Sequence, residues 1–133
     1  MKRAIIREGG AEVRTSNLSR FLLDDPNVLF AILFGSRSRG KEKRGSDLDL
    51  AVFFLDPPHG LEMLALINTL SNISGTQVDL VPLNSSSSLL RHQVMKYGTK
   101  LFVKDELQYR RFREKLMTDF EEYKYVSGMN AYA

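Results

Sequence analysis

The sequence contains no cysteine, no tryptophan and only two histidines among its 133 residues. Without cysteine the protein has no disulfide, no thiolate zinc site and no thiol nucleophile, which fits a reducing compartment. The two histidines, His59 and His92, are too few for a histidine-rich metal site. Any bound metal must therefore be held by oxygen ligands, which favours a hard cation such as Mg²⁺ over zinc.

Long hydrophobic runs are also absent. No apolar run approaches the roughly 20 residues that a helix needs to cross a bilayer. The longest candidates, residues 28–34 and 48–55, have the length of β-strands. The first ten residues lack the apolar segment of a secretory signal. We therefore expect a cytoplasmic protein without a membrane segment.

Charge of one sign is in only slight excess. The 19 basic and 16 acidic residues give a net charge of +3, and hydrophobic residues make up 43% of the chain, as in ordinary globular proteins. We expect a single domain over residues 1–133. Five basic residues nevertheless fall within eight positions, namely Arg37, Arg39, Lys41, Lys43 and Arg44. This cluster is either a solvated loop or part of a site for an anionic group.

The hydrophobic periodicity changes several times along the chain. Apolar and alternating runs predict strands at residues 27–34, 47–54, 76–83 and 100–103. Apolar residues at three- and four-residue intervals predict helices at 17–23 and 57–73, a helix from the serine run 85–88 to Gly98, and an amphipathic helix over about 105–126. This order favours an α/β (α+β) fold in which helices pack on one small sheet.

The ends of two predicted helices are also marked. Ser16 is the expected N-cap of the first helix, and Gly75 is expected to end the second. The first fourteen residues are not assigned, because the pair Gly9 and Gly10 suits either a hairpin turn or a loose arm.

Two aspartates begin the second predicted strand. In a strand, residues i and i+2 point to the same face, so the carboxylates of Asp47 and Asp49 are expected side by side, roughly 7 Å apart. Carboxylates this close repel each other unless a cation lies between them, and Mg²⁺ takes such oxygen ligands together with water and phosphate. The alternative is that both are exposed residues at the start of a strand.

Two further features accompany the aspartate pair. Gly35 and Ser36 follow the first predicted strand, where a glycine lets a phosphate approach the backbone and a following helix would offer free N–H groups. Asp79 lies within the apolar strand at 76–83, where a buried carboxylate without a partner costs several kcal/mol. A metal shared with the pair would offset that cost; alternatively, Asp79 lies on an edge strand and faces water.

These residues together form the pattern G-S-x10-D-x-D followed by a third aspartate. With this pattern, residues 16–104 resemble the nucleotidyltransferase superfamily that includes DNA polymerase beta, and in particular the minimal nucleotidyltransferases of prokaryotes, the MNT or MntA-like family. The resemblance implies the polymerase-beta-like fold, with a small mixed sheet. Many relatives carry an aromatic and a small residue where this chain has Arg37 and Ser38.

The resemblance also implies roles for the motif residues. Gly35 and Ser36 match the phosphate-binding turn, and Arg39 and Ser46 match the arginine and serine of the motif. The metal ligands and catalytic carboxylates would be Asp47, Asp49 and Asp79.

The implied activity is Mg²⁺-dependent nucleotidyl transfer. In the MNT family two Mg²⁺ ions and ATP serve the transfer of AMP to a tyrosine hydroxyl of a HEPN-domain toxin, so that the MNT protein acts as its antitoxin. Beyond the catalytic core only the predicted helix 105–126 and a short tail follow, so acceptor recognition is expected to come from a partner or from self-association into a homo-oligomer.

Two alternative functions remain open on the sequence. The acceptor is a small molecule or a nucleic acid in the first, with the basic cluster at residues 37–44 as its binding site, although direct nucleic-acid binding is not the expectation. In the second, the protein is a non-catalytic antitoxin that acts by binding alone.

Overall fold

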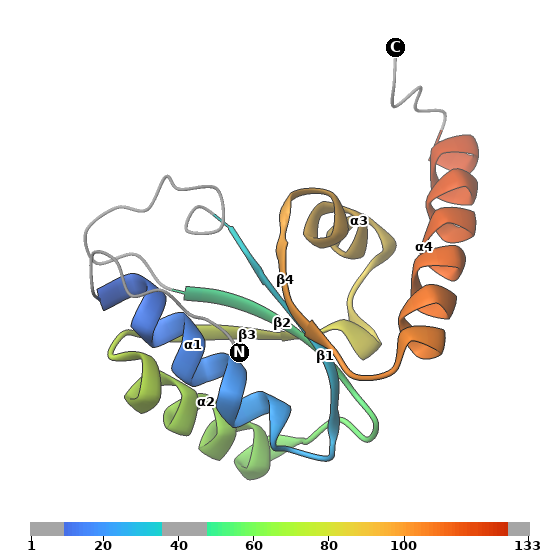
Figure 1. Cartoon of the computed structure of the whole chain (residues 1–133). Helices are drawn as coiled ribbons and strands as arrows, with labels where there is room; N and C mark the ends of the chain where they lie inside the picture. The colour runs from blue at the N-terminus through green and yellow to red at the C-terminus, as the bar shows by residue number, and fades with distance from the viewer. Residues whose placement is uncertain (1–9, 36–47, 128–133) are drawn as a thin grey trace.

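A four-stranded mixed sheet forms the centre of the fold (Figure 1). This computed structural model describes residues 10–35 and 48–127, with side chains described for residues 15–35 and 48–119. The strands lie in the order β3-β2-β1-β4. Their bounds are β1 Val28–Phe34, β2 Leu48–Phe54, β3 Val78–Pro82 and β4 Thr99–Val103. β1 pairs antiparallel with β2 and β4, and β2 pairs parallel with β3, so β3 is an edge strand.

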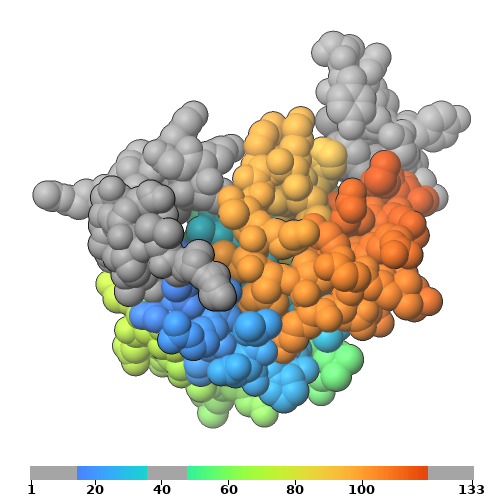
Figure 2. Space-filling view, viewed as in Figure 1, coloured from blue at the N-terminus to red at the C-terminus, as the bar shows by residue number. Residues whose placement is uncertain are grey.

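Four α-helices cover the two faces of this sheet. Their bounds are α1 Gly10–Leu23, α2 Gly60–Ser74, α3 Ser88–Tyr97 and α4 Glu106–Ser127, and a short 3-10 turn, η1, spans Leu83–Ser85. α1 and α2 pack next to each other on one face, and α3 and α4 pack next to each other on the opposite face (Figures 1 and 2). No helix in the described part of the chain is long and apolar enough to cross a membrane.

Each face of the sheet has its own hydrophobic core because side chains alternate along a strand. Leu48, Leu50 and Val52 of β2 pack with the helices α1 and α2. Ala51 and Phe53, which alternate with Leu50 and Val52 along β2, pack with α3 and α4. Phe53 stacks on Phe30 with ring centroids 5.1 Å apart, and Phe112 of α4 contacts both rings edge-on. The apolar runs of the sequence thus become strands that are buried on both sides.

The expected fold class is confirmed, with strands close to their predicted positions. The predicted starts or ends of helices are also confirmed in four places. Gly75 ends α2 with φ +77, Ser87 accepts a hydrogen bond from Leu90 N at the start of α3, and Asp105 accepts one from Gln108 N at the start of α4. Gly98 follows the last residue of α3, as expected. Glycine tolerates the left-handed conformation at Gly75, and the Ser and Asp oxygens satisfy backbone N–H groups.

Two predicted helix starts are wrong. α1 begins at Gly10 rather than at residue 17, so Ser16 lies inside the helix and is not its N-cap. The residues 11–14 include the good helix formers alanine, glutamate and arginine, which allow the helix to extend in that direction. α2 begins at Gly60 rather than at residue 57. The helical region is sterically disfavoured for Pro57 because Pro58 follows it.

Asn84 in η1 ties the end of β2 to the turn after β3. Its Oδ1 accepts a hydrogen bond from Phe54 N at 2.9 Å, and its Nδ2 donates to Phe54 O at 2.8 Å. The side-chain amide of Asn84 therefore makes the hydrogen bonds to Phe54 that the backbone of a neighbouring strand would otherwise make. Arg91 of α3 donates to Leu83 O and Asn84 O, each at 2.9 Å, which holds η1 against α3.

Replacement of Asn84 by alanine is expected to lower the free energy of unfolding by about 1–3 kcal/mol, because Phe54 loses both hydrogen-bond partners in a partly buried position. Asn68→Ala on the exposed face of α2 is the control, for which we expect less than about 0.5 kcal/mol. Urea denaturation of both variants measures the difference. Equal effects at the two positions would show that the Asn84 contacts contribute nothing specific.

Candidate active site

Two carboxylates meet at one end of the sheet. Asp49 of β2 lies opposite Phe34 of β1 on one side and opposite Asp79 of β3 on the other. Neighbouring strands are about 4.8 Å apart, and residues opposite each other direct their side chains to the same face. The parallel register therefore sets Asp49 and Asp79 next to each other.

The face that carries the two carboxylates is the one that α3 and α4 cover. Asp49 alternates with Leu48 and Leu50, which belong to the opposite core, and shares its direction with Ala51 and Phe53. Asp49 is half-buried and Asp79 is exposed on the edge strand. Asp79 thus lies on an edge strand and faces water, while its sharing of a metal with Asp49 stays a prediction. We therefore expect a cation here because two negatively charged carboxylates lie next to each other, and not because Asp79 is buried.

Gly35 closes the site at the end of β1. Its φ is +83, a conformation that side chains with a Cβ rarely adopt. A Cβ at this position would lie 2.1 Å from Asp49 Oδ2 and 2.9 Å from Asp49 Cγ. The sequence analysis explained Gly35 by the close approach of a phosphate. The structure adds a second reason why this position requires a glycine. The carboxylate of Asp49 occupies the space that any side chain at residue 35 would need.

Four of the seven predicted site residues lie outside the described residues, so their placement stays a prediction. They are Ser36, Arg39, Ser46 and Asp47, together with the basic cluster at residues 37–44. The structure does bring together the other three, Gly35, Asp49 and Asp79.

Sequence reasoning missed the part that Gly98 plays beside this site. A Cβ on Gly98 would lie 2.5 Å from Ile32 Cγ2, 2.5 Å from Val94 O and 3.1 Å from Leu33 O. Because Gly98 has no side chain, the end of α3 can approach β1 closely at Leu33, two residues before Gly35. The sequence marked Gly98 only as a helix end, and nothing in its local pattern indicates this long-range contact.

The donor set of the site suits a hard cation. Asp49 and Asp79 supply carboxylate oxygens, which Mg²⁺ prefers, whereas the sulfur ligands that favour zinc are excluded by the lack of cysteine. Among the described side chains, those of residues 15–35 and 48–119, no three metal-binding groups converge. A third carboxylate is available from Asp47, one residue before β2. The residues present therefore fit Mg²⁺ better than zinc.

We expect Gly35→Ala to destabilise the protein by at least about 1 kcal/mol more than Gly60→Ala, because only the first introduces a collision with Asp49. Gly60 is the matched control, since its φ is +54 and a Cβ at residue 60 would have nothing within 4 Å. In an Asp49→Ala background the excess cost of Gly35→Ala should largely disappear. Chemical denaturation of the four-member cycle measures this coupling, and a cost unchanged by Asp49→Ala would refute the contact.

Comparison with known protein families gives a match that includes the candidate active site. Residues 16–107 match the family model described as polymerase beta, nucleotidyltransferase. This range contains the described site residues Gly35, Asp49 and Asp79, and it agrees with the range of the resemblance seen in the sequence.

Two curated relatives carry one and the same protein name. The protein adenylyltransferase MntA of Shewanella oneidensis is 33% identical over 92 residues, which are 68% of this chain and 66% of that protein. The chain thus matches just under two thirds of the length of that relative. The protein adenylyltransferase MntA of Aphanizomenon flos-aquae is 26% identical over 126 residues, which are 87% of this chain and 83% of that protein.

A solved structure shares the fold over most of the chain. A crystal structure of a toxin-antitoxin with AMP-PNP superposes with a TM-score of 0.72 at 28% identity. The match covers 85% of this chain and 89% of that chain.

Proposed function

Because this chain belongs to the polymerase beta nucleotidyltransferase family, we propose that it transfers AMP from ATP to a hydroxyl group of a partner protein. The observation that carries the proposal is the register that sets Asp49 beside Asp79, with Gly35 against Asp49, at one end of the sheet. Two curated relatives named protein adenylyltransferase support both the nucleotide and the class of acceptor.

The carboxylates would hold the metal. Asp47, Asp49 and Asp79 are the proposed ligands of two Mg²⁺ ions, which supply the positive charge that neutralises the triphosphate when they are bound. The bound Mg²⁺ ions would also relieve the electrostatic repulsion between Asp49 and Asp79. The half-buried position of Asp49 strengthens its interaction with a cation, since water screens the charge less there.

The remaining motif residues would orient the nucleotide. Gly35 and Ser36 are proposed to contact phosphate oxygens through the backbone N–H groups of the turn and the serine hydroxyl. Arg39 is proposed to neutralise charge on the departing pyrophosphate, and Ser46 to support the turn before Asp47. All four residues fall within the range that matches the family.

The proposed reaction is an in-line displacement at phosphorus. Asp79, exposed beside Asp49, takes the proton of the acceptor hydroxyl. The hydroxyl oxygen forms a bond to the α-phosphorus of ATP, and the bond from that phosphorus to the bridging oxygen breaks. Pyrophosphate leaves with the bonding electrons, and AMP stays on the acceptor. The chain forms no covalent intermediate.

We further propose that the acceptor is a HEPN-domain toxin, modified at a tyrosine, and that this chain is its antitoxin. The likeness to the toxin-antitoxin structure that contains AMP-PNP supports the antitoxin role and the nucleotide. The reaction uses ATP, so we assign it to the cytoplasm. Neutralisation of the partner by binding alone is the competing function, and a label-transfer experiment separates the two.

Asp49→Asn and Asp79→Asn are each expected to reduce AMP transfer at least ~100-fold, since loss of a metal-binding carboxylate removes several kcal/mol of charge stabilisation. The assay follows label from α-labelled and from γ-labelled ATP with Mg²⁺ in a lysate of the native host. Asp56→Asn is the control, because Asp56 is an exposed carboxylate beyond the other end of β2.

Label on one protein from the α position alone, lost in both site variants and kept in the control, would support the proposal. Label from the γ position would indicate phosphate transfer instead. Folded wild-type protein that transfers no label, while Asp49→Asn still neutralises the toxin in cells, would favour binding alone.

A further inference from the structure

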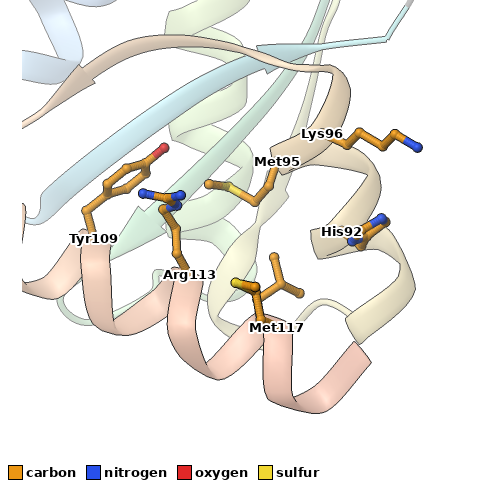
Figure 3. A pocket seen from close by; sticks show the side chains of 7 residues that line it. His92, Met95, Lys96, Tyr109, Arg113 and Met117 are labelled. Atoms are coloured by element: carbon orange, nitrogen blue, oxygen red, sulfur yellow. The ribbon is translucent and has the colours of Figure 1, made fainter. Parts of the chain in front are cut away.

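A hollow of about 330 Å³ lies between α3 and α4 (Figure 3), and none of its lining residues belongs to the candidate active site. Its walls include Met95 of α3 and Leu116 and Met117 of α4. Figure 3 shows Tyr109 and Arg113 rising from α4 beside Met95, with Lys96 farther along α3. Met117 is 66% exposed, so the hollow presents apolar surface to solvent. We call this hollow the α3–α4 groove.

The α3–α4 groove is positively charged. Its lining includes Lys96 and Arg113 and contains no aspartate or glutamate among the residues with described side chains. Arg113 and Lys100 stand 5.9 and 5.0 Å from the ring centroid of Tyr109, so two cations lie on one ring. Over residues 15–35 and 48–119, the structure places no carboxylate in an ion pair with Lys96 or Arg113. Gathered cations of this kind favour an anionic partner group.

A second hollow lies on the other side of α4. It differs in the interactions that its cationic side chains make within the chain. It measures about 290 Å³, and its lining includes Arg91, Arg111 and Lys115. Arg91 donates to two backbone carbonyls and lies 5.0 Å from the Phe112 ring centroid. Lys115 is paired with Asp119 at 3.2 Å. Two of its three cations thus form hydrogen bonds or an ion pair within the chain, whereas Lys96 and Arg113 lie over the rings of Tyr97 and Tyr109, which leaves the α3–α4 groove as the better anionic site.

The α3–α4 groove lies on the same side of the sheet as the two carboxylates. Asp49 and Asp79 are on the face that α3 and α4 cover, and Gly98 holds the end of α3 against Ile32 and Leu33 near the end of β1. Lys96 is two residues before Gly98. A chain segment bound in the groove therefore belongs to a molecule positioned on the catalytic side of the sheet.

We infer that the α3–α4 groove docks an acidic segment of the acceptor protein. An apolar side chain of that segment contacts Met95, Leu116 and Met117, and its flanking carboxylates face Lys96 and Arg113. This inference rests on the proposed function, which makes the acceptor a protein. The apolar walls suit a side chain better than a phosphate backbone.

The test uses the full chain and a fluorescein-labelled peptide with one leucine between two runs of three glutamates. Fluorescence anisotropy is expected to show saturable binding that Arg113→Glu weakens at least ~10-fold, or about 1.4 kcal/mol. Arg20→Glu is the matched control, because Arg20 is an exposed arginine on α1, across the sheet, and the change in net charge is the same. Its affinity should stay within about twofold. A peptide with alanine in place of leucine should bind more weakly.

Several outcomes would overturn the docking site. They are absence of peptide binding, equal losses in Arg20→Glu and Arg113→Glu, and tighter Arg113-dependent binding of a ten-nucleotide single-stranded RNA. Light scattering that shows a dimer broken by Arg113→Glu would assign the groove to a second copy of the chain.

The peptide assay contains no ATP, so it separates the docking site from the proposed activity. Arg113-dependent peptide binding by a chain that transfers no AMP would remove the proposed function and keep the groove. AMP transfer with an unchanged KM for the acceptor in Arg113→Glu would keep the function and remove the groove.

Discussion

The register between β2 and β3, which sets Asp49 beside Asp79, is the constraint on which the rest of this structure depends. Two carboxylates on neighbouring strands repel each other, so their pairing by itself opposes the register. The hydrophobic pairs that follow them hold the register: Leu50 lies opposite Leu80, and both belong to the core under α1 and α2. A slip of one residue would move every side chain of β3 to the wrong face. The apolar core thus fixes the charges in a position that a bound cation can use.

The two faces of the sheet accordingly differ in purpose. The face under α1 and α2 buries one continuous hydrophobic cluster, which stabilises the register. The opposite face combines a core of aromatic rings around Phe30 with the carboxylates at one end and the α3–α4 groove. Gly35 and Gly98 mark where the chain approaches itself too closely for any side chain. Both faces therefore contribute to stability, and the residues of the proposed chemistry lie on only one of them.

Much of the fold could be predicted from local patterns. The strands β1 and β2 are apolar runs that suit a sheet buried on both sides, and Gly75, Ser87 and Asp105 carry the conformations and hydrogen bonds of helix ends. What the sequence could not predict depends on contacts between distant segments. The exposure of Asp79 follows from the place of β3 at the sheet edge, and the contact of Gly35 with Asp49 follows from the β1–β2 pairing. No local pattern contains the strand order.

The exposure of Asp79 also connects the proposed chemistry to the proposed docking. A base that faces water can take a proton from water as readily as from a protein hydroxyl, so an open site of this kind favours hydrolysis of the nucleotide over its transfer. Selective transfer requires the acceptor to cover this end of the sheet and to hold its hydroxyl there. A surface that binds the acceptor on the face of α3 and α4 meets both requirements at once. On this reasoning acceptor binding would complete the site, and the proposed transfer would be selective only when the partner is bound.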